Sequence, residues 1–225
     1  MIRFYYTDLS KYALSTSLSH PLYHRAGLLL LERGLSDLGF RKKCAPDSAS
    51  RKGGEGLSPA AKVPLALSFD AHGKPFLPNE PNLHFSISHA GAYVICALSD
   101  QNIGADILDF RQNRRIMLLA KRFFSPKNFQ LLQKVAKEEV PSLFFQLFCA
   151  TESYTKLTGD GLSHGMKDLY MDEALLHVYD KRSSYSPSGY LTRPLQLAEY
   201  ACFLCTRLPL SEEICCIPVS FQKII

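Results

Sequence analysis

The chain has 225 residues, of which 46% are hydrophobic and 21% charged, which is typical of a globular protein forming one large domain or two small ones. No apolar run approaches the roughly 20 residues of a membrane span, and the first residues lack the apolar core of a signal peptide, so we expect no membrane association and a cytoplasmic location. The net charge of +5 suits an anionic partner, either a phosphorylated small molecule or an acidic protein, and without a nucleic-acid-binding signature no nucleic acid partner is expected.

The spacing of apolar residues predicts both strands and helices. In the first half we expect a strand at 2–6, a helix at 21–33 ended by Gly34, a basic loop at 41–62, and strands at 92–100 and 101–108 joined by a turn. In the second half we expect a helix from Ser125-Pro126 toward Val140, which Pro141 interrupts, and a helix at 143–157 capped by Gly159. Strand-like segments follow at 169–180, 198–208 and 212–220. Both halves, divided near residue 103, finish in strand pairs. The expected fold class is α+β, with room for two pseudo-symmetric subdomains.

Seven cysteines include a C-x-x-C pair, Cys202 and Cys205, so a zinc site has to be considered. The pair lies in AEYACFLCTRL, an apolar stretch without the glycines of a zinc knuckle. Free cysteine is among the most buried residue types, which favours buried thiols over metal ligands.

Glu152 and Lys156 lie one helical turn apart in ATESYTKLTGDGLS, and therefore share a helix face. Alone, such a pair is usually a solvated ion pair contributing about 0.3–0.5 kcal/mol. The aromatic residues that precede it place this helix in the core, and the glycine-rich turn that follows permits a ligand to approach closely. A functional site is the alternative to the surface ion pair.

Asp106, in QNIGADIL, shares one face of a predicted strand with Gly104 and Leu108. A carboxylate in an apolar strand costs free energy unless it is compensated, although a strand-end aspartate could reach solvent or cap a turn. Together with Glu152 it would provide the two carboxylates that Mg²⁺ uses when it also binds substrate phosphates.

Three weaker signals precede this strand. Ser88 and His89, in SISHAG, are predicted in a turn entering a strand, where backbone amides could receive an anion. Lys74-Pro75 places a lysine on a turn, and Arg25 adds a cation to the first helix. Each of these is weak alone, because a structural histidine or a solvated cation explains it equally well.

In order along the chain, the motifs G-K-P-x-x-P, F-S-I-S-H-A-G, I-G-A-D-I, A-K-R-F-F-S and A-T-E-S-Y-T-K-L-T-G-D-G-L resemble those of the surfactin-type 4′-phosphopantetheinyl transferases. The resemblance runs from about His24 to Leu162. It implies an enzyme that moves the 4′-phosphopantetheine arm of coenzyme A to a serine of an apo acyl or peptidyl carrier protein, with Mg²⁺ and with release of 3′,5′-ADP.

The resemblance also implies two pseudo-twofold-related α+β subdomains, 1–102 on the phosphoadenosine side and 103–225 on the metal and carrier side, in a monomer. An acidic carrier protein would dock near residues 109–124, which hold five cations and an apolar cluster. Carried over by motif, the roles are metal binding by Asp106 and Glu152, catalysis by Glu152 and Lys156, and coenzyme A binding by Arg25, Lys74, Pro75, Ser88, His89 and Lys156.

Three positions depart from the family pattern. The metal strand, usually D-x-E, ends in Leu108; the helix, usually K-E, reads Thr151-Glu152; and a glutamate that many relatives use as base is Leu118. Glu152 or a metal-bound water is then expected as the base. Two alternatives stay open: a catalytically weak relative that binds coenzyme A or a carrier protein, and an unrelated Mg²⁺-dependent nucleotide-phosphate enzyme.

Overall fold

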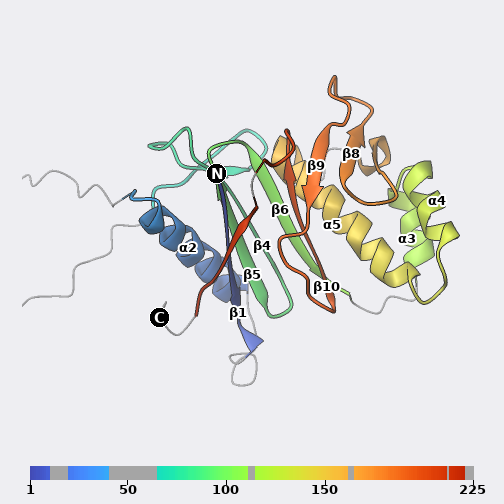
Figure 1. Cartoon of the computed structure of the whole chain (residues 1–225), viewed down its shortest axis with the longest axis horizontal. Helices are drawn as coiled ribbons and strands as arrows, with labels where there is room; N and C mark the ends of the chain where they lie inside the picture. Colours follow the sequence, from blue (N-terminus) through green and yellow to red (C-terminus); the bar gives the residue numbers. More distant parts are fainter. Residues whose placement is uncertain (11–19, 41–64, 111–114, 162–164, 212, 221–225) are drawn as a thin grey trace, which may run out of the picture.

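The computed structural model describes residues 1–10, 20–40, 65–110, 115–161, 165–211 and 213–220, and confirms an α+β fold (Figure 1). The elements are β1 (Ile2–Asp8), α2 (His20–Asp37), β2 (Ser68–Phe69), β3 (Pro75–Phe76), β4 (His84–Ala90), β5 (Tyr93–Ser99), β6 (Ile103–Asp109), α3 (Ile116–Phe123), α4 (Pro126–Lys134), α5 (Val140–Thr158), the 3₁₀ helix η2 (Met166–Asp168), β7 (Leu169–Met171), β8 (His177–Asp180), β9 (Gly189–Thr192), β10 (Tyr200–Thr206) and β11 (Cys215–Pro218). Within these described ranges, no helix is long and apolar enough to cross a bilayer. The loop predicted at 41–62 lies outside them.

The first sheet has the strand order β11-β1-β5-β4, and α2 packs on it (Figure 1). The helix does not end at Gly34, as the sequence predicted, but continues to Asp37. A Cβ on Gly34 would lie 2.7 Å from the side chain of Leu98 and 2.9 Å from that of Tyr5. This glycine therefore permits close packing of the helix on the sheet rather than ending the helix.

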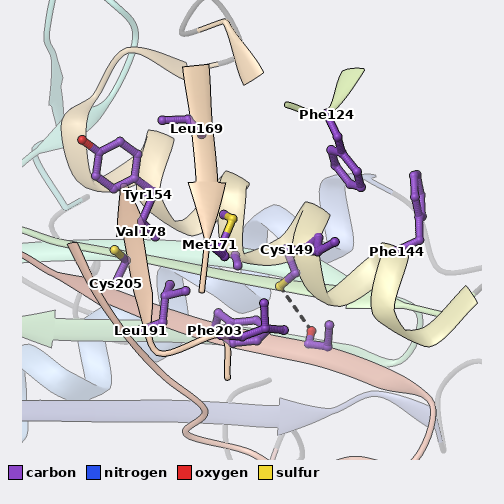
Figure 2. Close-up of a cluster of buried hydrophobic side chains, with 14 of the residues drawn as sticks. Phe124, Phe144, Cys149, Tyr154, Leu169, Met171, Val178, Leu191, Phe203 and Cys205 are labelled. Atoms are coloured by element: carbon purple, nitrogen blue, oxygen red, sulfur yellow. Dashed lines mark hydrogen bonds between the residues drawn. The ribbon is translucent and has the colours of Figure 1, made fainter. Parts of the chain in front are cut away.

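The second sheet has the order β6-β10-β9-β8-β7 and carries α5 across it. Side chains from the helix and the strands interlock in the core between them, as Figure 2 shows, and Cys149 of α5 donates a hydrogen bond to the Ala201 carbonyl of β10. The segment 169–180, predicted as strand-like, is a hairpin of β7 and β8. Burial on this sheet makes α5 a rigid platform for the residues on its other faces.

The helices before α5 differ from the prediction in their boundaries. Ser125 caps α4 by accepting a hydrogen bond from the backbone of Asn128, as expected for its Ser-Pro start, but the helix stops at Lys134. Pro141 does not interrupt α5, which begins at Val140. Proline is tolerated in the first turn of a helix because its missing N–H has no partner there.

The two sheets meet where β4, the edge of the first, lies beside β6, the edge of the second; we call this contact the seam and define it by Ser86, Ser88, Ala105 and Asp106. The Ser86 hydroxyl accepts a hydrogen bond from the Ala105 N–H at 2.9 Å and donates one to its carbonyl at 3.3 Å. Such a side chain replaces a backbone ladder bond and satisfies both polar groups. β11 pairs with β1 in the first sheet, and the division into subdomains at 102/103 stays a prediction.

The C-x-x-C cysteines are buried free thiols, as favoured by the sequence. Cys202 packs into the core between the two sheets, whereas Cys205 packs into the core beneath α5. Residues three apart on a strand face opposite sides. The pair therefore cannot converge on one metal ion.

Candidate active site

Gly104 brings α5 against β6. A Cβ at this position would lie 2.0 Å from the Ser153 carbonyl oxygen and 2.4 Å from the Leu157 backbone nitrogen, both on the helix. Only glycine allows the two backbones to come this close. Side chains on this face of β6 therefore reach those of α5 directly.

Asp106 lies two residues further along the same face and is only 4% exposed. Its Oδ1 accepts hydrogen bonds from the Ser88 hydroxyl at 2.6 Å and from the Lys156 ammonium at 2.7 Å. Its Oδ2 is buried and has no hydrogen-bond partner. The alternative of a strand-end aspartate that reaches solvent is wrong, because the carboxylate points into the crossing of strand and helix.

Lys156 forms its ion pair across the structure rather than along its helix. Its ammonium contacts Asp106 on β6 and donates a longer hydrogen bond, 3.4 Å, to the Ile87 carbonyl on β4. The side chain is 30% exposed, so it spans from the buried carboxylate toward solvent. This arrangement differs from the ordinary surface pair that an isolated E-x-x-x-K spacing indicates.

Glu152 lies one turn before Lys156 and is half-buried. Burial raises the pKa of its carboxyl, the charge of Asp106 raises it further, and Lys156 acts in the opposite direction. A raised pKa means that this carboxylate binds a proton more readily than an exposed one. Two carboxylates of unlike environment thus flank one ammonium group.

Ser88 and His89 lie within β4 and not in a turn before a strand, as the sequence had suggested. Alternation places the Ser88 hydroxyl inward on Asp106 and leaves His89 exposed. The imidazole stacks on Tyr23 of α2, with ring centroids 4.3 Å apart, and the partial desolvation of the ring lowers its pKa, with Lys156 and His20 acting in the same direction. Tyr23, which the sequence analysis missed, carried no signal beyond an aromatic near Arg25.

Lys74 precedes β3 and turns inward. Its ammonium donates hydrogen bonds to the Asn102 side chain at 2.7 Å and to the Leu157 carbonyl at 3.2 Å, and burial lowers its pKa to about 8. Asn102 also donates to that carbonyl, at 2.7 Å. The lysine is therefore fixed beside the C-terminal end of α5, and Asn102 is a second residue that the sequence gave no reason to select.

A cavity of about 230 Å³ has both Lys74 and Lys156 in its lining. It is lined by the turn His72–Pro75, by Phe85, Ser86 and Ile87 of β4, and by Thr155, Lys156, Gly159 and Gly161 at the end of α5. Lys74, Pro75 and Lys156 thus face one space, whereas Arg25 is exposed on α2. A larger cavity of about 440 Å³, lined by Met1, Arg3 and Phe40 among others, holds none of the predicted site residues in its lining.

The side chains at this site supply part of what a hard divalent cation such as Mg²⁺ needs for binding. Within the described ranges, no group of three or more His, Cys, Asp or Glu side chains is placed to hold a metal ion. Asp106 nevertheless has a buried, unpartnered carboxylate oxygen, and Glu152 supplies a second carboxylate on the facing helix. Mg²⁺ is commonly bound by one or two carboxylates when substrate phosphates and waters complete its shell.

The structure places two of the residues that depart from the family pattern, Leu108 and Leu118, in different environments. Leu108 is half-buried and packs against the core beneath α5. Leu118 is 67% exposed on α3, next to the exposed Met117. Of the predicted docking segment 109–124, residues 111–114 lie outside the described part of the chain.

Comparison with known proteins gives one family match that includes this site and several similar curated proteins. A sequence model described as the 4′-phosphopantetheinyl transferase superfamily matches residues 102–205, which include Asp106, Glu152 and Lys156. The 4′-phosphopantetheinyl transferase Sfp of Bacillus subtilis strain 168 is 41% identical over 103 residues, 45% of each chain. A second Bacillus subtilis 4′-phosphopantetheinyl transferase is 36% identical over 48% of this chain and 46% of its own.

The longest of these alignments is to 4′-phosphopantetheinyl transferase psf-1 of Bacillus pumilus, 30% identical over 66% of this chain and 64% of that protein. The matched part of the chain thus spans between about half and two thirds of the length of these curated relatives. The site and these matches together indicate the class: residues 102–205 match the 4′-phosphopantetheinyl transferase superfamily. The resemblance to the surfactin-type members is confirmed.

Proposed function

We propose that the chain transfers the 4′-phosphopantetheine arm of coenzyme A to a serine of an apo acyl or peptidyl carrier protein and releases 3′,5′-ADP, with Mg²⁺ as the metal. The observation that carries this proposal is the convergence of Asp106, Glu152 and Lys156 at the crossing of β6 and α5. These residues belong to the segment that matches the superfamily. Lys74 and Lys156 line the adjoining cavity, which gives it the positive charge that a pyrophosphate requires.

The reaction forms a bond between the serine oxygen and the phosphorus that bears the pantetheine arm, and it breaks the bond from that phosphorus to the 3′,5′-ADP oxygen. We assign the serine proton to Glu152, because the raised pKa of its carboxyl makes it a stronger proton acceptor than an exposed glutamate. We assign Lys156 to the pyrophosphate, where its ammonium stabilises the charge that the departing 3′,5′-ADP carries away.

Asp106 and Glu152 are the residues that would hold Mg²⁺. When bound, the metal supplies neutralisation of negative charge on the pyrophosphate oxygens. The hydroxyl of Ser88 fixes the orientation of the Asp106 carboxylate through its 2.6 Å hydrogen bond. A carboxylate held in this way needs little reorganisation when charge develops beside it.

We assign the phosphoadenosine end of coenzyme A to His89, Arg25 and Lys74. Tyr23, in the first turn of α2, stacks on His89 of β4, and Arg25 lies on the same helix as Tyr23. Cationic and aromatic side chains suit a phosphate and an adenine ring, respectively. We assign Pro75, beside Lys74, to the adenine as well.

The acidic carrier protein is assigned to α3. Met117, Leu118 and Phe123 are exposed large apolar residues on this helix, and Lys121 and Arg122 are exposed cations between them. An apolar patch of this kind, rimmed by positive charge, suits an amphipathic and acidic partner. Leu118 would then contribute to docking, whereas a catalytic base at its position would require a glutamate.

The test is an incubation of the full chain with coenzyme A, Mg²⁺ and several folded apo-carrier proteins, followed by intact mass measurement. We expect a gain equal to the phosphopantetheine group on the carrier, no gain with EDTA, and no gain on a carrier whose acceptor serine is replaced by alanine. A protein that binds coenzyme A but transfers nothing to any carrier would instead be a binding module, in line with its departures at Leu108 and Leu118. The expected monomeric state can be checked in the same preparation by light scattering.

A further inference from the structure

The ammonium of Lys156 and the carboxylate of Asp106 make the shortest charge–charge contact in the candidate site, 2.7 Å. Asp106 is almost fully buried, and the contact is supported by the Ser88 hydroxyl on the same oxygen. Removing one partner from a buried pair of this kind leaves a charge without compensation. Lys156 therefore stabilises the aspartate in the folded protein, in addition to any role toward a ligand.

The same contact opposes metal binding by electrostatics. A divalent cation on the remaining oxygen, Oδ2, would share one carboxylate with an ammonium that contacts Oδ1. Two positive charges a few ångströms apart repel each other, and burial weakens the screening by solvent. Asp106 can therefore bind a metal tightly only if Lys156 moves away or if additional negative charge arrives.

The ammonium of Lys156 can occupy a second position, in the neighbouring cavity. Its side chain is 30% exposed and lines the cavity that also contains Lys74. Its hydrogen bond to the Ile87 carbonyl is long, 3.4 Å, and little holds the ammonium apart from Asp106 itself. Rotation of this flexible side chain would carry the ammonium from the carboxylate to an anion in the cavity.

We propose that Lys156 is an exchangeable cation: it neutralises Asp106 until the pyrophosphate of the substrate takes over the ammonium and frees the carboxylate for the metal. This inference rests on the proposed function, because it takes Asp106 and Glu152 as the metal ligands. It predicts that metal binding to the protein alone is weak and that substrate and metal bind cooperatively, each raising the affinity of the other by the same factor.

The experiment measures binding of Mn²⁺ to the full chain by electron paramagnetic resonance, without coenzyme A. We expect Lys156→Met, which keeps the length of the side chain and removes its charge, to bind Mn²⁺ about tenfold more tightly than the unaltered protein. Lys74→Met is the matched control, since it removes a charge from the same cavity without touching Asp106. It should change Mn²⁺ affinity much less.

Unchanged or weaker Mn²⁺ binding by a folded Lys156→Met protein would overturn the exchange, as would an equal gain in Lys74→Met. Circular dichroism checks folding, and Lys156→Gln serves if the methionine variant does not fold. Asp106→Asn, measured with coenzyme A present, separates this inference from the proposed function. If that variant binds Mn²⁺ as well as the unaltered protein, the metal assignment itself is wrong; if it loses Mn²⁺ while Lys156→Met gains nothing, only the exchange is wrong.

Discussion

Replacing Gly104 with alanine tests whether the crossing of β6 and α5 creates the site. The added Cβ would lie 2.0 Å from the Ser153 carbonyl oxygen, and Cβ atoms essentially never come within 3.0 Å of such neighbours. Strand and helix must therefore separate by about 1 Å at this point. Both neighbouring atoms, on Ser153 and Leu157, belong to the backbone, and neither can be relieved by turning a side chain.

Overpacking of a well-packed core costs about 1–3 kcal/mol, and we expect the upper end here because the backbone has to move. For a chain of this size, 1 kcal/mol corresponds to about 2–4 °C in Tm, so the midpoint should fall by roughly 6–12 °C. A shift of about 1 Å between Asp106 and Lys156 should also reduce kcat/KM for transfer by on the order of 100-fold.

Thermal unfolding followed by circular dichroism measures the first effect, and carrier modification below the melting temperature measures the second. Gly27→Ala on α2 is the matched control. The three atoms nearest its Cβ all belong to the Ile87 side chain, with Cγ2 at 2.7 Å, so a side chain and not the backbone has to shift, and the melting temperature should fall less than in Gly104→Ala. Equal melting temperatures for Gly104→Ala and the unaltered protein would refute the proposed close contact.

Three further predictions follow from the site. Glu152→Gln should lower transfer by at least about 100-fold, because it removes the proposed base, and Leu108→Glu should tighten Mg²⁺ binding, because it adds a carboxylate on the face of Asp106. Full Mg²⁺-dependent activity in both Glu152→Gln and Asp106→Asn would place the metal elsewhere. Arg115→Glu should raise the KM for the carrier several-fold with little change in coenzyme A affinity, and unaltered carrier kinetics would remove this part of the segment from the docking site. Because burial lowers the pKa of Lys74 to about 8, its ammonium loses its proton as pH rises through 8, and coenzyme A affinity should fall between pH 7 and 9. Lys74→Gln should bind more weakly and without that fall, so parallel pH profiles in titration calorimetry would contradict the assignment.

Local sequence patterns predicted which segments form helices and strands better than they predicted the residues at which those elements begin and end. The Ser125-Pro126 start of α4 was predicted correctly, because its capping chemistry is contained in neighbouring residues. Gly34 and Pro141 were misread, because their roles depend on where they lie in the fold: one permits close packing and the other begins a helix. A sequence shows that a residue is unusual, but only the packed structure shows which of its properties is used.

The site was predictable as a set of residue types and not as a set of contacts. The motif order selected Asp106, Glu152 and Lys156, and the structure places the aspartate and the lysine 2.7 Å apart. Helical spacing, however, joined Lys156 to Glu152, because only neighbours along one element can be inferred from spacing. The pairing of Asp106 with Ser88 depends on two edge strands from different sheets, which no local pattern can register.

That arrangement explains why weak motifs far apart in the sequence act together. Along the seam, Ser86 contacts Ala105 and Ser88 contacts Asp106, so the contacts advance in the same direction on both strands. Alternation makes this possible, since serines two apart on β4 face the same side, toward the edge of β6. The S-I-S motif therefore has a structural role toward β6. The Ser86 hydroxyl joins the two sheets, and the Ser88 hydroxyl orients the Asp106 carboxylate that Lys156 neutralises. Changing the relative position of the two sheets would alter the environment of Asp106 directly, and for this reason we count the seam as part of the candidate active site.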